Sequence, residues 1–304
     1  MKEFRMDFNI ELDKRVKYAE TVIKTCLIDP EQSGSDRQAE IYEAMNYSIL
    51  AGGKRIRPVL LLETNRLFGG NDEDIHAFMA AVEMVHTYSL VHDDLPAMDN
   101  DEFRRGRKTT HVVYGEAMGI LTGDALLNYA FETGLNGVMK AGNMQNAVKA
   151  LKILADKAGV FGMIGGQVVD IKNDGRCVEL ETLDYINELK TGALIEASMM
   201  MGAILAGASE EELQLVECAA SDIGRAFQIQ DDILDVTGTA EVLGKPVLSD
   251  EKNNKSTYVT LLGIDEASAR VKDLTEGAIA TLRKLKYENE FLYDLIYSLV
   301  YRKK

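Results

Sequence analysis

Residues 209–235 read SEEELQLVECAASDIGRAFQIQDDILD, and this stretch predicts one long helix that ends in a cluster of aspartates. Ser209 and Glu212 have the spacing of a capping box, in which two side chains satisfy the first free amides of a helix. After them, apolar residues recur at intervals of three or four, as on the buried face of a helix. The stretch contains no proline and no alternation of period two, so it favours helix over strand.

The same helical periodicity extends along most of the chain. Only four prolines occur among the 304 residues, and none lies between Pro96 and Pro246, which permits long helices in the middle of the sequence. We expect further helices at about 12–27, 37–50, 59–68, 73–95, 115–135, 144–158, 183–206, 257–263, 266–286 and 289–301. No segment shows convincing strand alternation, and 96–112 and 237–256 read as long loops. The sequence therefore predicts a single all-α domain over residues 1–304, with ten or more helices.

Composition and charge exclude several classes of protein. Apolar residues make up 46% of the chain and charged residues 27%, which is ordinary for a globular protein and not for a disordered one. The 49 acidic residues outnumber 34 Lys and Arg, for a net charge of −15. Nucleic acids and anionic membranes bind proteins with surplus Lys and Arg, so neither partner is expected. The longest uncharged apolar stretch, 197–208, is too short to span a bilayer.

The three cysteines indicate the compartment. Cys26, Cys177 and Cys218 are far apart and form no C-x-x-C pair, so they suit neither a zinc site nor a disulfide framework. The first fourteen residues, MKEFRMDFNIELDK, contain no apolar run of the kind that a secretion signal needs. A reducing cytoplasm is therefore the expected location.

Two aspartate clusters each end an apolar helix. The first, in VHDDLPAMD at 91–99, contains Asp93, Asp94 and Asp99, and the second, in FQIQDDILD at 227–235, contains Asp231, Asp232 and Asp235. Pro96 disfavours helix in the residue before it, so the first helix should stop there and a turn should return Asp99 towards Asp93. Carboxylates without histidine or cysteine favour Mg²⁺ or Mn²⁺ over Zn²⁺. The alternative interpretation is a solvated acidic helix end at each position.

Basic residues gather beside glycines despite the acidic composition. GGKRIRP at 52–58 places Lys54, Arg55 and Arg57 immediately before a helix, and RRGRK at 104–108 adds four more cations. Arginine suits bidentate contact with phosphate, and lysine acts as a point charge. Taken singly, each residue could be an ordinary exposed cation, but their clustering favours anion binding.

Isolated polar residues on apolar helices are further candidates. Gln167 and Gln228 interrupt apolar segments, and His86 and His92 lie on the same helix as the first aspartates. Either histidine could be a core or helix-surface residue, and for His86 we favour contact with a substrate.

Together these motifs resemble the trans-isoprenyl diphosphate synthases, and within that family the bacterial farnesyl diphosphate synthases. The resemblance rests on GGKRIRP at 52–58, HDDLPAMDNDEFRRGRKTTH at 92–111, GDALL at 123–127, MIGGQVVDI at 163–171, KTGAL at 190–194, FQIQDDILD at 227–235, LGKPVLSD at 243–250 and KSTY at 255–258. The matching segments span nearly the whole chain in order. The resemblance implies a polyprenyl synthetase domain, in which an all-α bundle surrounds a central apolar cavity.

The resemblance also implies a role for each motif residue. Lys54, Arg57, His86 and Arg105 would form the isopentenyl diphosphate pocket. Asp93, Asp94, Asp99, Asp231 and Asp235, with Asp232 nearby, would hold Mg²⁺ on the allylic diphosphate, about three ions in all, with Mn²⁺ as the alternative metal. Arg104, Lys190, Lys245 and Lys255 would contact the same diphosphate. Lys190, Thr191 and Gln228 would act in catalysis by placing their dipoles beside the reacting carbons.

The implied reaction is ionisation, condensation and elimination, in which isopentenyl diphosphate and dimethylallyl or geranyl diphosphate give farnesyl diphosphate. Tyr88 and Ser89, five and four residues before Asp93, would form the floor of the hydrocarbon pocket and stop growth at C15. Plain core packing is the alternative interpretation of Tyr88. The resemblance further implies a homodimer.

Other functions remain open at this point. A geranyl or geranylgeranyl diphosphate synthase is the nearest alternative, followed by a long-chain polyprenyl synthase, which Tyr88 disfavours. A class I terpene cyclase would not need the second aspartate cluster or GGKRIRP. A non-catalytic partner subunit and an acidic helical scaffold that binds divalent ions are disfavoured by the intact aspartates and by Lys54, Arg57, Lys190 and Lys245.

Overall fold

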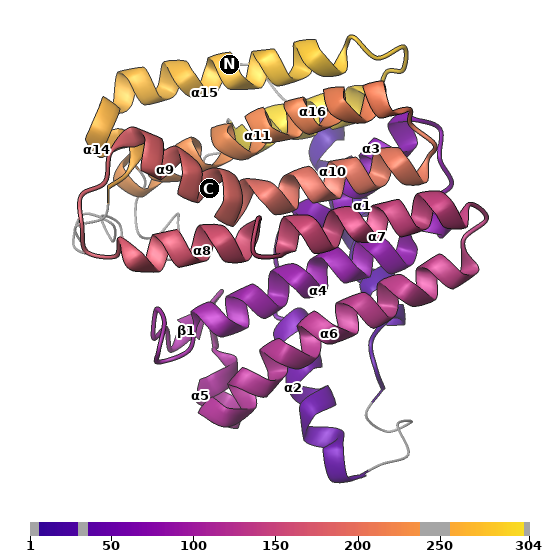
Figure 1. The fold of residues 1–304 in the computed structure, drawn as a ribbon, viewed down its shortest axis with the longest axis vertical. Coiled ribbons are helices and arrows are strands. Elements are labelled where there is room, and N and C mark those ends of the chain that lie inside the picture. The colour runs from indigo at the N-terminus through magenta and orange to yellow at the C-terminus, as the bar shows by residue number, and fades with distance from the viewer. Residues whose placement is uncertain (1–5, 30–35, 238–255, 301–304) are drawn as a thin grey trace.

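The computed structural model describes residues 6–29, 36–237 and 256–300 (Figure 1). Its α-helices are α1 (Met6–Thr25), α2 (Ala39–Ile49), α3 (Ile56–Leu67), α4 (His76–Asp93), α5 (Thr110–Tyr114), α6 (Glu116–Lys140), α7 (Met144–Ala158), α8 (Met163–Lys172), α9 (Leu180–Asn187), α10 (Ala193–Leu205), α11 (Glu210–Thr237), α14 (Tyr258–Leu262), α15 (Ile264–Leu282) and α16 (Glu290–Val300). Two short turns, η1 (Asp36–Gln38) and η2 (Glu73–Ile75), and a π-helix, η3 (Glu188–Gly192), complete the helical elements. The predicted all-α bundle of ten or more helices is confirmed.

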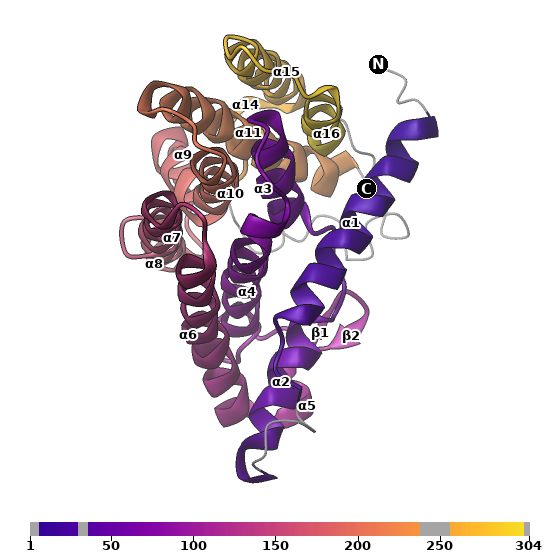
Figure 2. The ribbon, with the colours of Figure 1, turned by 90° about the vertical axis from the view of Figure 1, so that its right-hand side faces the viewer.

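Helix α4 lies in the interior of the bundle. It packs against α6 along most of its length and contacts α1, α2, α3 and α10 as well. Its first half is mostly apolar, and Phe78, Met79, Val82, Met84 and Val85 have no exposed surface. A helix that is apolar all round is stable only when other elements cover it. Figure 2 accordingly shows α6, α7 and α8 on one side of α4 and α1 on the other.

The capping box that opens α11 is confirmed. The Ser209 amide donates to Glu212 Oε2 at 2.9 Å, and the Glu212 amide donates to Ser209 Oγ at 3.3 Å. The helix then continues without a break past the second aspartate cluster to Thr237. No helix in the described ranges combines the length and apolar character needed to cross a membrane.

The expectation of a strand-free loop at 96–112 was wrong. Phe103–Arg104 (β1) and Arg107–Lys108 (β2) form an antiparallel hairpin, and α5 begins within the same stretch. The turn residues Arg105 and Gly106 have φ values of 53° and 73°. Two positive φ values give the turn twist that matches a two-residue hairpin. Strands of two residues are too short to be detected as an alternating pattern.

A glycine sets the distance between α3 and α10 in the core. A Cβ atom on Gly202 would lie 2.9 Å from the Asn65 amide nitrogen and closer still to the Leu61 carbonyl oxygen. Both atoms belong to the backbone of α3, so no side chain can move aside. The two helices can therefore approach only while this residue is glycine.

We expect Gly202→Ala to lower the free energy of unfolding by about 1–3 kcal/mol, because α10 must move away from α3. Gly142→Ala is the matched control, since a Cβ atom there meets nothing within 4 Å. Denaturant unfolding of both variants measures the difference. Equal stability of the two variants would contradict the prediction.

Candidate active site

The first aspartate cluster forms where α4 ends. Asp93 is the last helical residue, and the Asp99 amide donates to the Asp93 carbonyl at 2.9 Å, which confirms the predicted return turn. The second cluster lies near the end of α11, and Figure 1 shows the C-terminal ends of α4 and α11 at the same end of the bundle. Carboxylates at helix C-termini oppose the helix dipole, so nearby cations are needed to stabilise them.

Protein groups already hold two carboxylates of the first cluster. Gln167 Nε2 on α8 donates to Asp93 Oδ1 at 2.9 Å, and Arg104 Nε donates to Asp94 Oδ1 at 2.7 Å. Burial raises the pKa of Asp93, although Lys190 opposes the shift. Burial also raises the pKa of Asp94 to about 6, against the attraction of Arg104. Burial therefore disfavours the ionised form of both carboxylates, and a further cation beside them would favour it.

The helix predicted at 183–206 is interrupted by the π-helix η3, which contains Lys190 and Thr191. Short π-helical segments are rare and are frequently found at functional sites. Lys190 Nζ donates to Asp170 Oδ2 at 2.7 Å. Burial lowers the pKa of Lys190, but Asp170, Asp93 and Asp99 outweigh burial, and the net shift is upward. Lys190 therefore stays protonated among three aspartates.

Glycines allow α8 and α11 to lie directly against η3. A Cβ atom on Gly166 of α8 would meet the Lys190 amide, and it would lie 2.8 Å from Leu189 Cβ. A Cβ atom on Gly224 of α11 would lie 2.8 Å from Gly192 Cα. This close packing brings the predicted catalytic pair together.

The predicted catalytic residues Thr191 and Gln228 are in contact. Thr191 Oγ1 donates to Gln228 Oε1 at 3.3 Å, across two elements that are far apart in the sequence. Gln228 Nε2 in turn donates to Asp232 Oδ1 at 3.2 Å. Asp232 Oδ2 accepts the Tyr258 amide at 2.8 Å, so Asp232 links the end of α11 to α14.

A basic cavity of about 680 Å³ lies between the GGKRIRP loop and α11. Its charged and polar lining includes Lys54, Arg55, Arg57, Glu83, His86, Arg105, Thr191, Gln228 and Asp231. Burial lowers the pKa of Arg57 to about 10, and its buried Nε has no hydrogen-bond partner among the described residues. Burial, followed by Arg57 and Arg105, lowers the pKa of His86 well below its usual value. The imidazole is therefore neutral at pH 7.

Arg55 is paired within the protein, although its place in GGKRIRP suggested a third cation for anion binding. Its backbone is left-handed, with φ 49°, and its guanidinium points into the protein with 4% of the residue exposed. Arg55 Nη1 donates to Glu83 Oε1 at 2.7 Å. A buried arginine requires such a partner, so Arg55 is paired with Glu83 at the wall of the cavity that Lys54 and Arg57 also line.

A second, mainly apolar cavity of about 400 Å³ lies between α4, α6, α8 and η3. Its apolar wall includes Tyr88, Leu90, Leu127, Met163, Ile164 and Val168, and Asp93, Gln167 and Lys190 also line it. Arg57, His86 and Thr191 line both cavities. Two ligands could therefore bind side by side, one held by cations and the other with its tail among apolar side chains.

The two predicted chain-length residues line the apolar cavity. Tyr88 is 5% exposed, and its hydroxyl is buried without a hydrogen-bond partner among the described residues. Burial, with a smaller contribution from Asp93, raises the pKa of Tyr88 to about 12. Ser89 Oγ donates to the His86 carbonyl at 2.9 Å, which turns the hydroxyl towards the backbone.

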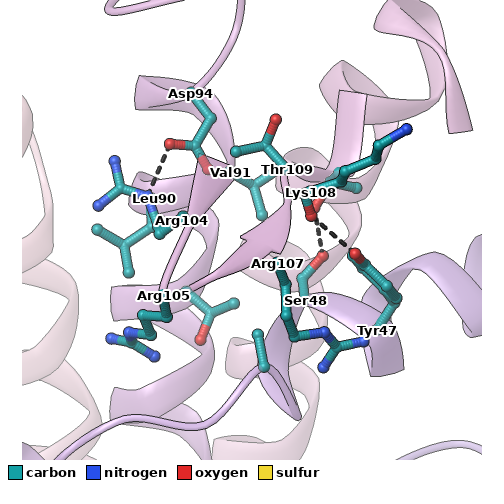
Figure 3. Close-up of a pocket in the computed structure, with 13 residues that line it drawn as sticks. Tyr47, Ser48, Leu90, Val91, Asp94, Arg104, Arg105, Arg107, Lys108 and Thr109 are labelled. Atoms are coloured by element: carbon teal, nitrogen blue, oxygen red, sulfur yellow. Dashed lines mark hydrogen bonds and ion pairs between the residues drawn. The ribbon is translucent and has the colours of Figure 1, made fainter. Parts of the chain in front are cut away.

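The β1–β2 hairpin separates its cations into two pairs. In Figure 3, Arg104 and Arg105 point to one side of the hairpin, and Arg107 points towards Tyr47 of α2. The Arg107 guanidinium lies 4.3 Å from the centre of the Tyr47 ring, and Tyr47 Oη donates to the Lys108 carbonyl at 2.7 Å. These contacts attach the hairpin to α2 and leave Arg105 to line the basic cavity.

Comparison with known proteins agrees with this architecture. A sequence profile described as polyprenyl synthetase matches residues 38–294. The chain belongs to the polyprenyl synthetase family. It is 42% identical over 267 residues to a farnesyl diphosphate synthase of Micrococcus luteus, covering 88% of this chain and 91% of that protein. The solved structure of an FPP/GFPP synthase from Zymomonas mobilis superimposes with a TM-score of 0.84 at 31% identity, covering 97% of this chain and 99% of that one.

The chain is also similar to a relative that is named for a different product. It is 47% identical over 239 residues to a chloroplastic geranylgeranyl pyrophosphate synthase of Capsicum annuum. The alignment covers 78% of this chain but only 64% of the plant protein. Sequence identity therefore shows the family, and the length of the product has to be argued from the cavity.

The proposed metal ligands come from the end of α4 and the turn that follows it, and from α11. In the part of the chain that the structure describes, no group of three or more acidic, histidine or cysteine side chains lies close enough to hold an ion by itself. Mg²⁺ commonly takes one or two carboxylates and completes its shell with water and substrate phosphate. Asp93 lines the apolar cavity and Asp231 lines the basic one, and such sparse carboxylates fit that ion.

Some predicted residues cannot be placed. Lys245 and Lys255 lie outside the described residues, as does the whole of LGKPVLSD. Two residues received no role from the sequence, Gln167 as the partner of Asp93 and Asp170 as the partner of Lys190. Both lie in MIGGQVVDI, and their polar side chains on an apolar helix were the available signal.

His86 should make this polyprenyl synthetase sensitive to acid. The pKa of His86 is lowered in the folded protein. Below a pH of about 6.5 the unfolded chain therefore binds a proton that the folded protein does not bind. The free energy of unfolding consequently decreases as the pH decreases. We expect wild type to lose about 1 kcal/mol more stability than His86→Gln between pH 7 and 5.5. Denaturant unfolding at each pH measures this difference. Parallel losses in both proteins would contradict it.

Proposed function

We propose that the protein catalyses head-to-tail condensation of isopentenyl diphosphate with dimethylallyl or geranyl diphosphate and releases farnesyl diphosphate. The observation that carries the proposal is the pair of adjoining cavities, one basic and one apolar, which share Arg57, His86 and Thr191. An enzyme that joins two prenyl diphosphates needs such a pair, because one substrate contributes its double bond and the other its reactive carbon.

The basic cavity is the proposed site for the diphosphate of isopentenyl diphosphate. Lys54, Arg57 and Arg105 supply positive charge to this cavity. Neutral His86 adds a hydrogen bond without adding charge. A cavity with these cations can hold a diphosphate through charge-assisted hydrogen bonds alone.

The aspartates are the proposed site for the allylic diphosphate and its metal. Asp93, Asp94 and Asp99 from the first cluster, and Asp231 and Asp235 from the second, would hold Mg²⁺, and the number of ions stays a prediction. When bound, Mg²⁺ acts as a Lewis acid that stabilises negative charge on the departing diphosphate. Lys190 carries positive charge beside Asp93, and Arg104 carries it beside Asp94. These cations stabilise the same developing charge.

The groups at the junction of the cavities are the proposed stabilisers of the allylic carbocation. Thr191 lines both cavities and contacts Gln228, which lines the basic one, and Lys190 lines the apolar one, so the hydroxyl and carbonyl dipoles of these three residues would act there. Such dipoles lower the energy of a cation without forming a covalent bond to it. The apolar wall keeps water away from the cation. The final proton passes to the released diphosphate, so the proposal assigns no protein base.

The exposed apolar side chains support the proposed homodimer. Leu121 and Met139 of α6, Met144 and Val148 of α7, and Val168 of α8 are exposed, and Phe161 between α7 and α8 is 90% exposed. Figure 2 has these three helices together on one side of the molecule. Exposed apolar side chains on neighbouring helices favour a protein–protein interface there.

Cytoplasmic location remains a prediction. Cys26, Cys177 and Cys218 are free thiols in the structure, which is consistent with a reducing compartment.

The proposed function is tested by incubating the purified protein with Mg²⁺, radiolabelled isopentenyl diphosphate and either dimethylallyl or geranyl diphosphate. We expect farnesyl diphosphate from both starters, identified by chromatography after dephosphorylation, and no product in EDTA. Geranyl or geranylgeranyl product would favour the alternative synthases. Cyclic hydrocarbon would favour a terpene cyclase, and no product would favour a non-catalytic subunit.

The chain-length proposal is tested at Tyr88. We expect Tyr88→Ala to shift product from C15 towards C20, because removal of the ring extends the apolar cavity. Tyr88→Phe is the matched control, since it keeps the ring and removes only a hydroxyl without a partner, and its product should remain C15. Unchanged C15 output from Tyr88→Ala would assign the ring to core packing.

A further inference from the structure

The basic cavity contains an acidic side chain that the proposed reaction does not use. Glu83 of α4 lines the cavity and is 3% exposed. A carboxylate repels the diphosphate that this cavity is proposed to bind, and burial of a charge is costly. Its position therefore requires a reason other than contact with the ligand.

Glu83 forms an ion pair with Arg55, and Arg55 connects the GGKRIRP loop at 52–58 to the neighbouring helices. Arg55 Nη1 lies 2.7 Å from Glu83 Oε1, and Arg55 Nη2 donates to the Ile49 carbonyl at 2.7 Å. Arg55 Nε also lies 3.7 Å from Glu20 Oε1 of α1. A single guanidinium thus connects α4 with the end of α2 and with α1, immediately before α3 begins.

The ion pair also fixes an unfavourable backbone conformation. Arg55 precedes α3 with φ 49° and ψ 35°, in the left-handed region that residues with a Cβ atom avoid. Such a conformation persists only where surrounding contacts enforce it. Arg55 lines the cavity together with Lys54 before it and Arg57 after it, and its inward turn fixes the backbone between those two residues.

Glu83 lies one helical turn from His86. Residues three apart on a helix share a face, so one face of α4 carries both the anchor of the loop and the imidazole of the cavity. The position of Lys54 and Arg57 relative to His86 is therefore set through Glu83.

Glu83 also balances the cations of the cavity. Burial lowers the pKa values of Arg57 and Arg105, and in both cases Glu83 is the main charge that opposes the shift. Arginines that face one another repel, and a fixed anion among them reduces that repulsion before the ligand binds.

We propose that Glu83 is a positioning residue for the isopentenyl diphosphate pocket: through its ion pair with Arg55 it fixes the GGKRIRP loop against α4 and so aligns Lys54 and Arg57 with His86. The inference rests on the proposed function of the same cavity. Glu83 itself does not contact the substrate.

The test compares Glu83→Gln with Glu63→Gln. Glu63 is the matched control, because it is 1% exposed, accepts from Arg15 Nε at 2.7 Å and from Arg66 Nη1 at 2.8 Å, and lines neither cavity. We expect Glu83→Gln to raise the KM for isopentenyl diphosphate about tenfold and to change the KM for geranyl diphosphate and kcat less than about threefold. Glu63→Gln should lower the melting temperature and leave both KM values at the wild-type level.

Calorimetric titration with isopentenyl diphosphate in EDTA measures the same affinity without turnover. We expect about tenfold weaker binding to Glu83→Gln and wild-type binding to Glu63→Gln. If Glu83→Gln does not fold, Glu83→Asp keeps the charge on a shorter side chain, and its KM for isopentenyl diphosphate should still rise. A wild-type KM in the soluble Glu83 variant, or a parallel rise of both KM values, would overturn the inference. Absence of prenyl product from wild type would overturn the proposed function instead.

Discussion

The burial of α4 is the constraint on which the candidate site depends. The helix is covered by α6 on one side and by α1, α2, α3 and α10 elsewhere, so it has little freedom to shift. Its residues Glu83 and His86 line the basic cavity, and its residues Tyr88 and Asp93 line the apolar one. One rigid helix thus determines the distance between the two proposed substrates, and that distance decides whether their carbons can react.

Around this helix, glycines determine how near the catalytic elements come. Gly166 and Gly224 let α8 and α11 lie against the backbone of η3. The π-helical turn at Glu188–Gly192 then holds Thr191 beside Gln228, and Lys190 beside Asp170. A site that must stabilise a carbocation benefits from this rigidity, because preorganised dipoles need no rearrangement when charge develops.

Global and local charge act differently in this protein. A net charge of −15 argues against nucleic acids and anionic membranes as binding partners. If only the net charge of the whole chain mattered, it would also argue against diphosphates as ligands. Within the basic cavity the local balance is reversed, since Lys54, Arg55, Arg57 and Arg105 face Glu83 and Asp231. Part of the acidic excess forms the aspartate clusters proposed to bind metal, and a bound cation reverses the local sign there.

The sequence alone determined the helical class, the two aspartate clusters, the capping box at Ser209 and the turn that returns Asp99 to Asp93. These features depend on residues within about one or two turns of each other, so periodicity and local sterics suffice to predict them. The resemblance to a known family supplied the substrates and the residue roles, which spacing could not.

Only the tertiary structure decided which charges face the ligand and which face the protein. The inward turn of Arg55 depends on Glu83, 28 positions later, and the support of Asp93 depends on Gln167, 74 positions later. The π-helix at Lys190 and Thr191 likewise depends on contact with α8 and α11, not on local propensity. Such contacts form only when separate helices pack, and local sequence patterns carry no information about that packing distance.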